Sequence, residues 1–128
     1  MANEPTPVHA PKAPKALGPY SAAMAAGELL FLSGQTPIDP ATGELVEADI
    51  KAQTERCILN LKAVLEAAGS GLDKVAKTTC FLTDMADFSA FNEVYARYFT
   101  GKPARSTVAV KALPKGAMVE IELIALRG

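Results

Sequence analysis

Residues 103–120 read Pro-Ala-Arg-Ser-Thr-Val-Ala-Val-Lys-Ala-Leu-Pro-Lys-Gly-Ala-Met-Val-Glu, and the rest of the chain is interpreted around this stretch. It holds an arginine after a proline, a short β-like run, a Pro-Lys-Gly turn and a second apolar run with a glutamate. The guanidinium of Arg105 offers a planar fork of donors that suits a carboxylate or a phosphate. Glu120 stands where a strand is expected, which is a costly place for a carboxylate without a partner or a function.

The stretch predicts a β-hairpin in which residues 106–111 pair with residues 118–127. In that register Glu120 lies about four residues along the ladder from Arg105, or about 13 Å at about 3.3 Å per residue. Two inward-reaching side chains at this separation would flank a molecule of a few heavy atoms. The alternative is a surface arginine and a surface glutamate on an edge hairpin, with no functional role.

Composition places the chain among single-domain soluble proteins. It has 128 residues, of which 49% are hydrophobic and 21% are charged, as in an ordinary globular domain. The formal net charge of -1 argues against a general nucleic-acid binder. No apolar run is long enough to span a bilayer, and the first residues lack the core of a signal peptide. We therefore expect a cytoplasmic protein that binds neither a membrane nor a specific nucleic acid.

The cysteines and the single histidine argue against a metal site. Cys57 and Cys80 show neither metal-ligand spacing nor a disulfide framework, and both fall in apolar segments typical of a core. His9 stands in a proline-rich segment, so neither a zinc site nor a His-based triad is expected. The sequence predicts chemistry without a metal or another cofactor.

The chain divides into a lead-in over residues 1–17 and one domain over residues 18–128. The lead-in is expected to be extended and poorly ordered because of its prolines, which are Pro5, Pro7, Pro11 and Pro14. Gly18-Pro19-Tyr20 ends it with a turn that would fix the direction of Tyr20. Residues 21–26 weakly favour a strand, paired through a Gly27-Glu28 turn with a clearer strand over residues 29–33.

A loop over residues 34–46 is followed by two helices that alternate with a strand. Asp49 is expected to cap a helix that runs to Ala68 and is closed by Gly69. Residues 75–82 read as a strand, and a second helix is expected from Asp84 through Phe99.

These elements predict an α+β fold in which one sheet carries two helices on a single face. Residues 29–32 and 121–126 are largely apolar at both strand parities, so both faces of the sheet would need burial. Two helices can cover only one face. We therefore expect an obligate homo-oligomer, with a second subunit covering the other face.

Several segments resemble, in order, the Rid (YjgF) family of small reactive-imine deaminases. The matching segments are Gly18-Pro19-Tyr20-Ser21, Ser33-Gly34-Gln35 with Pro37, Pro40 and Thr42-Gly43-Glu44, Ala67-Ala68-Gly69, Val75-Ala76-Lys77-Thr78-Thr79, Asp87-Phe88 through Asn92, Pro103-Ala104-Arg105-Ser106, Leu113-Pro114-Lys115-Gly116 and Val119-Glu120-Ile121-Glu122. Together they cover nearly everything after the lead-in. The resemblance implies a chorismate-mutase-like fold assembled as a homotrimer, with three sites between subunits.

The resemblance also implies an activity and the residues that carry it. The activity is hydrolysis of enamine and imine acids, such as 2-aminoacrylate and 2-iminobutanoate, to 2-oxo acids and ammonia. Arg105 would hold the substrate carboxylate, and Glu120 would place or activate the water. The residues expected to line the site are Tyr20, Ser33, the backbone of Gly34 and of Thr107, Phe91 and Asn92.

Other interpretations of single residues stay open. Ser33 is equally suited to capping a turn, and Tyr20 to covering an edge of the core. Glu122 lies two residues from Glu120 on the same strand face, so it is an alternative catalytic carboxylate. Position 107, often cysteine in the bacterial deaminases, is threonine here, and the loop 100–102 is shorter than in many of them. An imine that is open to water needs no covalent nucleophile, so these differences bear on substrate size more than on reaction type.

Three other functions compete with deamination. Some members of the family are described as ribonucleases or translation inhibitors, but this chain lacks a basic stripe interleaved with aromatic residues. Others are described as stress-activated holdases, a function that would not depend on Arg105. A non-catalytic sensor of amino or oxo acids would need Arg105 as an enzyme does.

Overall fold

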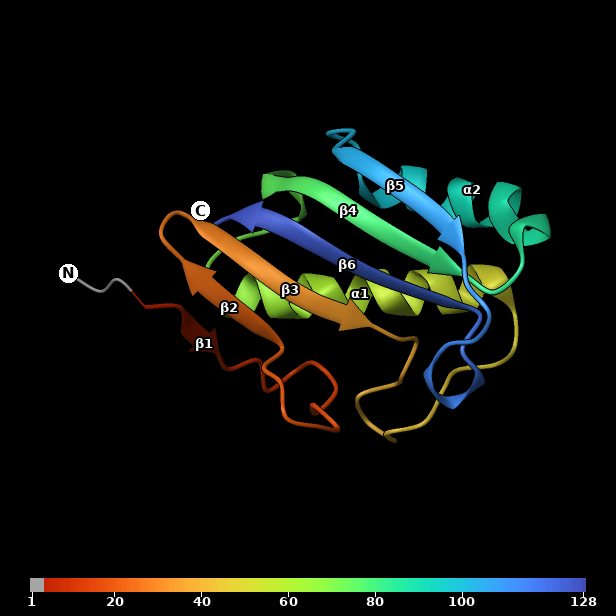
Figure 1. Ribbon diagram of the computed structural model, residues 1–128, viewed down its shortest axis with the longest axis horizontal. Coiled ribbons are helices and arrows are strands. Elements are labelled where there is room, and N and C mark those ends of the chain that lie inside the picture. Colours follow the sequence, from red (N-terminus) through yellow and green to blue (C-terminus); the bar gives the residue numbers. More distant parts are fainter. Residues whose placement is uncertain (1–3) are drawn as a thin grey trace.

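Two helices lie side by side against one face of a six-stranded sheet (Figure 1). The computed structural model describes residues 4–128. The strands are β1 (Thr6–Val8), β2 (Ala23–Ala26), β3 (Leu29–Gln35), β4 (Val75–Leu82), β5 (Ala104–Ala109) and β6 (Val119–Leu126). The helices are α1 (Ile50–Ala67) and α2 (Phe88–Tyr98), with short 3-10 turns at Leu72–Lys74, Met85–Asp87 and Pro114–Gly116. The prediction of one sheet with two helices on a single face is confirmed.

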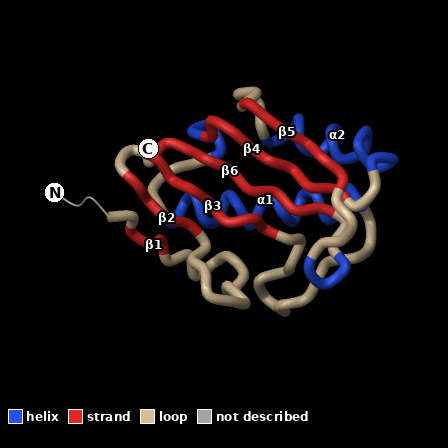
Figure 2. The backbone as a smooth tube through the Cα atoms, viewed as in Figure 1, coloured by secondary structure: helices blue, strands red, loops and turns tan. Residues whose placement is uncertain are grey.

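The sheet order is β1-β2-β3-β6-β4-β5 (Figure 2), and β4 runs parallel to β5, as their arrows show (Figure 1). The predicted hairpin of residues 106–111 with 118–127 is therefore wrong. β6 lies between β3 and β4, whereas β5 forms the edge beyond β4. The apolar residues that alternate along β6 are buried, which explains its central place, because a central strand can be buried while an edge strand stays more exposed. Residues 110–118 therefore connect β5 to β6 on the far side of β4 and do not form a tight turn.

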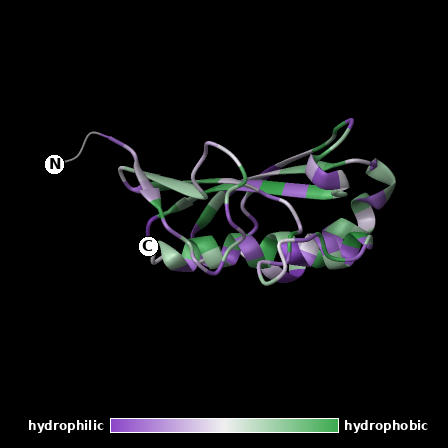
Figure 3. Ribbon diagram, turned by 90° about the horizontal axis from the view of Figure 1, so that it is seen from below, coloured by the Kyte–Doolittle hydropathy of each residue, from purple (hydrophilic) through white to green (hydrophobic). Residues whose placement is uncertain are grey.

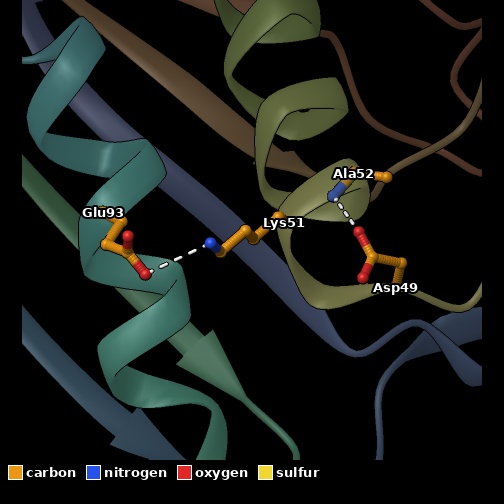
Figure 4. Close-up of polar contacts among 4 residues, drawn as sticks. All are labelled: Asp49, Lys51, Ala52 and Glu93. Atoms are coloured by element: carbon orange, nitrogen blue, oxygen red, sulfur yellow. Dashed lines mark hydrogen bonds and ion pairs between the residues drawn. The ribbon is translucent and has the colours of Figure 1, made fainter.

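The first hairpin and the start of α1 follow the sequence signals closely. The turn between β2 and β3 contains Gly27 with a φ of 59°, a conformation that favours glycine. The Asp49 carboxylate accepts the backbone N–H of Ala52 at 2.9 Å and caps α1 (Figure 4). The second helix begins later than predicted: Asp84 caps the 3-10 turn Met85–Asp87, and α2 proper starts at Phe88.

The segment before Gly18 is more regular than its prolines predict. Thr6–Val8 forms edge strand β1 beside β2, with Pro7 opposite Met24. Proline is tolerated there because an edge strand has one side without a ladder. Ala13, only 6% exposed, packs into the core. The expectation of a poorly ordered lead-in is thus wrong for these residues, while residues 1–3 of it lie outside the described part of the chain.

The core fills the space between the helices and the sheet (Figure 3). Cys57 of α1 and Cys80 of β4 are both fully buried in it, as predicted. Two buried amides of α1 bind nearby backbone. Asn60 donates to the carbonyls of Thr36 and Ile38 at 3.2 and 2.8 Å. Gln53 accepts the N–H of Met118 at 2.9 Å, so α1 fixes the loop after β3 and the start of β6.

On the outer surface, α1 and α2 are joined by two polar contacts. Lys51 and Glu93 form an ion pair at 3.3 Å (Figure 4), but both side chains are more than half exposed. Such pairs contribute about 0–1 kcal/mol. The Tyr98 hydroxyl donates to the Glu55 carboxylate at 2.5 Å. Burial of apolar side chains, not these contacts, therefore holds the helices together.

The sheet face away from the helices carries exposed apolar side chains. Phe31, Val108 and Leu126 are 42%, 46% and 49% exposed. They alternate along their strands with residues that face the core, as the sequence pattern predicts. The oligomer that would cover this face stays a prediction. Neither helix of residues 4–128 has the length and apolar character needed to span a membrane.

Candidate functional site

Glu120 projects from the sheet face opposite the helices. Its neighbours on β6, Val119 and Ile121, are fully buried in the core, so strand alternation turns Glu120 the other way. The side chain is half-buried. Across the strand pair, β3 changes register between Leu32 and Gln35, and this irregularity brings Gly34 against Glu120.

The absence of a side chain at Gly34 makes room for the Glu120 carboxylate. A Cβ on Gly34 would overlap Glu120 Oε2 and lie 2.9 Å from Cδ. Carboxylate and backbone are therefore in close contact, which any other residue at position 34 would disturb. Because Gly34 does not have a positive φ, the steric space and not the backbone conformation favours glycine here.

Burial raises the pKa of Glu120, and the nearby negative charge of Glu122 raises it further. A carboxylate with a raised pKa is a stronger base than an ordinary glutamate, which suits proton abstraction from water. Glu122 itself is exposed. Of the two candidate carboxylates, Glu120 thus has the environment typical of a general base.

Glu120 lies in the wall of a cavity of about 520 Å³. Four of the expected site residues line it together: Tyr20, Ser33, Gly34 and Glu120. The Ser33 hydroxyl donates to the carbonyl of Ser21 at 2.7 Å. This bond joins β3 to the segment before β2 and leaves the hydroxyl only its acceptor capacity for a ligand. Residues that the sequence did not single out also line the cavity, among them Lys15, Thr36, Ile38 and Lys115.

Arg105 lies on the other side of the sheet, against α2. Its Nη1 donates to Asn92 Oδ1 at 2.7 Å. The guanidinium carbon is 4.7 Å from the ring centroid of Tyr95, 5.5 Å from that of Phe88 and 5.9 Å from that of Phe91. These distances are in the range of cation–π attraction. Arg105, Asn92 and Tyr95 share a surface recess with Phe99 and Pro103.

Phe91 is fully buried within one copy of the chain, and its ring lies below the Arg105 guanidinium. The expectation that it contacts substrate stays a prediction. Thr107, two residues after Arg105, projects from the same face of β5 and lies opposite Cys80. Within the described residues its Oγ1 is buried and has no hydrogen-bond partner.

The role of Tyr95 and Phe88 beneath Arg105 was not found from the sequence. Their spacing with Phe91, at i, i+3 and i+7, predicts one apolar helix face, which is most simply explained by packing against the sheet. Tyr95 also hydrogen-bonds Thr78 Oγ1 at 2.7 Å. The sequence signal that could have indicated this contact is Arg105, which is predicted at the start of a strand and could meet the aromatic face of α2.

Within one copy of the chain, the two candidate groups do not form one site. Arg105 is level with Thr78, which pairs with Leu123 of β6, so Glu120 is two strands away and three residues further along. The two side chains also leave opposite faces of the sheet. The expectation that they flank one small molecule across a hairpin is therefore wrong within a single chain.

Neither thiol is placed to act as a nucleophile. Burial raises the pKa of Cys80 to about 11 and raises that of Cys57 as well. Across residues 4–128, no group of three or more His, Cys, Asp or Glu side chains is arranged to hold a metal ion. The polar groups available at these two places are thus the Glu120 carboxylate, whose pKa is raised, and the Arg105 guanidinium, which has no acidic partner within the described residues.

Comparison with known proteins places this arrangement in a family. The profile of the family described as Endoribonuclease L-PSP matches residues 10–127. Reactive Intermediate Deaminase A, chloroplastic, from Arabidopsis thaliana is 50% identical over 115 residues, covering 89% of this chain and 62% of that protein.

Two solved structures share the fold closely. YyfA from Yersinia pestis, of the Rid protein family, is 50% identical with a TM-score of 0.93, covering 96% of this chain and 99% of that one. E. coli TdcF with bound serine is 40% identical with a TM-score of 0.91, at the same coverage of each chain. The chain therefore belongs to the Endoribonuclease L-PSP family, the family of the Rid proteins that its sequence motifs resemble.

Proposed function

We propose that this protein hydrolyses 2-imino and 2-enamino acids, such as 2-iminobutanoate and 2-aminoacrylate, to 2-oxo acids and ammonia. The reaction would take place in the cytoplasm, in a site that two copies of the chain complete. One observation carries the proposal: among residues 4–128 the Arg105 guanidinium has no carboxylate within ion-pairing distance, and Glu120, whose pKa is raised, lies on the opposite face of the same sheet. Packing one copy against another would let Arg105 of one face Glu120 of the next.

Two relatives support this choice of substrate class. One bears the name of a reactive intermediate deaminase. The other is described with bound serine, a small amino acid with the same carboxylate and nitrogen around one carbon as a 2-imino acid. The apolar face around Phe31, Val108 and Leu126 supports the assembly, which we propose to be a homotrimer. Sedimentation of a compact monomer at micromolar concentration would contradict it.

Arg105 would bind the substrate carboxylate. Asn92 holds one of its nitrogens, which leaves the other donors of the planar fork for two parallel bonds to a carboxylate. This contact would orient the imine carbon and withdraw electron density toward the carboxylate end. The cavity lined by Tyr20, Ser33 and Gly34 would receive the side chain and the nitrogen.

Glu120 would carry the proton transfers. It takes a proton from water while the oxygen bonds to the carbon of the protonated imine, C=NH2⁺, and the π electrons move to nitrogen. The resulting aminol accepts the proton from Glu120 on its nitrogen. Glu120 then removes the hydroxyl proton as the C–N bond breaks, so that a 2-oxo acid and ammonia form. The ammonia takes the last proton, and the carboxylate is regenerated.

Mixing two inactive variants tests the site between copies. Arg105→Ala and Glu120→Gln should each be nearly inactive when assembled alone. If the variants are unfolded and refolded together, random assembly gives about one quarter of the sites both intact residues, one from each copy. About a quarter of the wild-type rate is therefore expected. If the mixture stays as inactive as its components, the site does not combine Arg105 and Glu120 from different copies.

The bidentate contact has a separate test. Arg105→Lys keeps the charge but loses the planar fork. Losing one partner of a buried charged pair costs about 2–5 kcal/mol, so kcat/KM for 2-iminobutanoate should fall at least about 30-fold. Arg105→Ala should be worse, and both variants should keep the assembly in gel filtration. A fully active Arg105→Lys protein would leave Arg105 a structural residue.

The alternatives predict different results. A sensor of amino or oxo acids would bind its ligand through Arg105. It would not lower the amount of imine that semicarbazide traps when a threonine dehydratase releases it. A ribonuclease, the activity that the name of the Endoribonuclease L-PSP family suggests, would cleave RNA with a rate that collapses on added salt. Imine hydrolysis should be far less sensitive to salt. A holdase would suppress aggregation equally well without Arg105.

A further inference from the structure

We infer that Asn92 and Tyr95 are positioning residues that hold Arg105 without a counter-charge, so that its full positive charge is left for an anionic group of the ligand. The inference rests on the proposed function for the identity of that ligand. It goes further by assigning Asn92 to the arginine instead of to the substrate.

The groups that contact Arg105 lie at favourable distances but carry no charge. Asn92 offers an amide oxygen at 2.7 Å, and the three aromatic rings offer their faces. Among the described residues, Lys51–Glu93 is the ion pair that forms, and no carboxylate lies within ion-pairing distance of Arg105. A half-buried arginine usually gains from an acidic partner. Here neutral groups take that partner's place.

The nearest ring is itself held in place. The Tyr95 hydroxyl shares a hydrogen bond of 2.7 Å with Thr78, the residue opposite Arg105 on the adjacent strand. Its ring also packs on Phe99, with centroids 4.5 Å apart, and on Phe91 at 5.6 Å. Tyr95 is therefore a rigid support, fixed to the same strand pair that carries Arg105. A ligand would meet a guanidinium whose direction is set in advance.

The choice of asparagine at position 92 has an alternative of the same shape. Aspartate would accept from the same Nη1 atom and would bind the guanidinium more strongly, because both partners would be charged. The folded protein would become more stable, but the ligand carboxylate would then compete with the aspartate carboxylate for the guanidinium. Asparagine places the guanidinium in the same way without this competition, so the protein is less stable but binds the ligand more tightly.

Asn92→Asp separates this role from a merely structural one. The probe is 2-oxobutanoate, the expected product, whose binding needs no turnover, with its uncharged amide as a reference ligand. Titration calorimetry of the assembled protein should show the Kd for the acid raised at least about tenfold, which is about 1.4 kcal/mol. The Kd for the amide should change little. The thermal midpoint should stay level or rise, since a structural defect would lower it.

Three further variants act as controls. Arg97→Gln changes the net charge by the same amount on an exposed part of α2, and it should leave the Kd for the acid unchanged. Asn92→Ala removes the contact without adding charge, so its effect should be smaller than that of Asn92→Asp. Tyr95→Phe keeps the ring but loses the bond to Thr78, and it should weaken binding of the acid about threefold or less.

The results decide the inference either way. Tighter or equal binding of the acid by Asn92→Asp would overturn it, as would equal losses in Asn92→Asp and Asn92→Ala. The inference would also be overturned if the wild-type protein did not bind the acid, or if Arg105→Ala bound it as tightly as the wild type. If Arg105-dependent binding follows the expected order but no imine is hydrolysed, the inference stands and the proposed enzymatic function fails.

Discussion

The carboxylate of Glu120 occupies the space that a side chain at Gly34 would fill. The two residues lie on neighbouring strands, β6 and β3, at the point where the pairing between them changes register. The Glu120 carboxylate is thus held against bare backbone. The identity of residue 34 determines where the Glu120 carboxylate lies.

Gly34→Ala should lower kcat at least about tenfold, because the new methyl group pushes the Glu120 carboxylate out of its place. Gly101→Ala is the matched control, since a Cβ at Gly101 meets nothing within 4 Å and its φ is not positive. Steady-state kinetics on 2-iminobutanoate measure both. Adding Glu120→Asp to Gly34→Ala shortens the acid and should recover part of the rate. An unaffected Gly34→Ala enzyme would show that this contact does not position the base.

Glu120→Gln should lower turnover about 10²-fold or more without lowering stability. The folded-state pKa of Glu120 is raised, so the native protein binds its proton more tightly than the unfolded chain does. The free energy of unfolding therefore falls as pH rises from the unfolded-state pKa to the folded-state pKa of Glu120, and above that pH the ionised carboxylate destabilises the folded protein. Glutamine cannot ionise, so the free energy of unfolding in urea at neutral pH should stay level or increase. A marked loss of stability would contradict this account.

Glu122→Gln should move the acidic limb of the kcat/KM profile to lower pH. Glu122 raises the pKa of Glu120 through its charge, so removing that charge lets Glu120 ionise at lower pH. The maximal rate should change little, because Glu122 is exposed beside the base. If Glu122→Gln loses activity while Glu120→Gln retains it, the two residues have exchanged roles.

Thiol alkylation under native conditions should leave activity intact. Cys57 and Cys80 are fully buried, and burial raises the pKa of both thiols. Mass spectrometry after iodoacetamide treatment should find unmodified protein, whereas protein unfolded in guanidinium should take two labels. Inactivation in step with labelling of the folded protein would instead point to an accessible, functional thiol.

Asn60→Leu should lower stability by about 1–3 kcal/mol, the usual cost of a buried unsatisfied group. It leaves the carbonyl of Ile38 without its donor, whereas the carbonyl of Thr36 keeps the backbone N–H of Ile38. Both residues line the cavity beside Glu120, so KM should rise as well. Chemical denaturation with kinetics on the same sample measures the two effects. Unchanged stability would mean that the loop finds other partners.

The local elements of this fold follow from sequence because their signals are local. Asp49 caps a helix, Gly27 turns a hairpin, and apolar residues of α1 recur every three or four positions. Strand partners are a different matter. β5 and β6 are consecutive and both strand-like, yet they do not pair, because pairing depends on which strand the whole sheet buries at its centre.

The same limit applies to the site. The residues around Glu120 come together as the motifs predict, but the side from which each strand residue projects depends on register. The wrong hairpin placed Arg105 and Glu120 on one face, whereas the observed sheet separates them. Phe91 is predicted as a ligand contact by the family resemblance and not by any local sequence pattern. Only packing shows that its ring lies beneath the guanidinium, in the core.

The central position of β6 constrains how the chain folds during synthesis. Synthesis reaches this strand after the other strands of residues 4–128, yet it joins β3, as in the pairing of Leu30 with Ala125, to β4. Until β6 pairs, β1–β3 and β4–β5 are separate fragments, each with an open strand edge. Long-range pairing of this kind forms slowly and exposes such edges to association. A chain that stops before β6 should therefore aggregate in a translation reaction, whereas the 128-residue chain should become protease-resistant once β6 can pair.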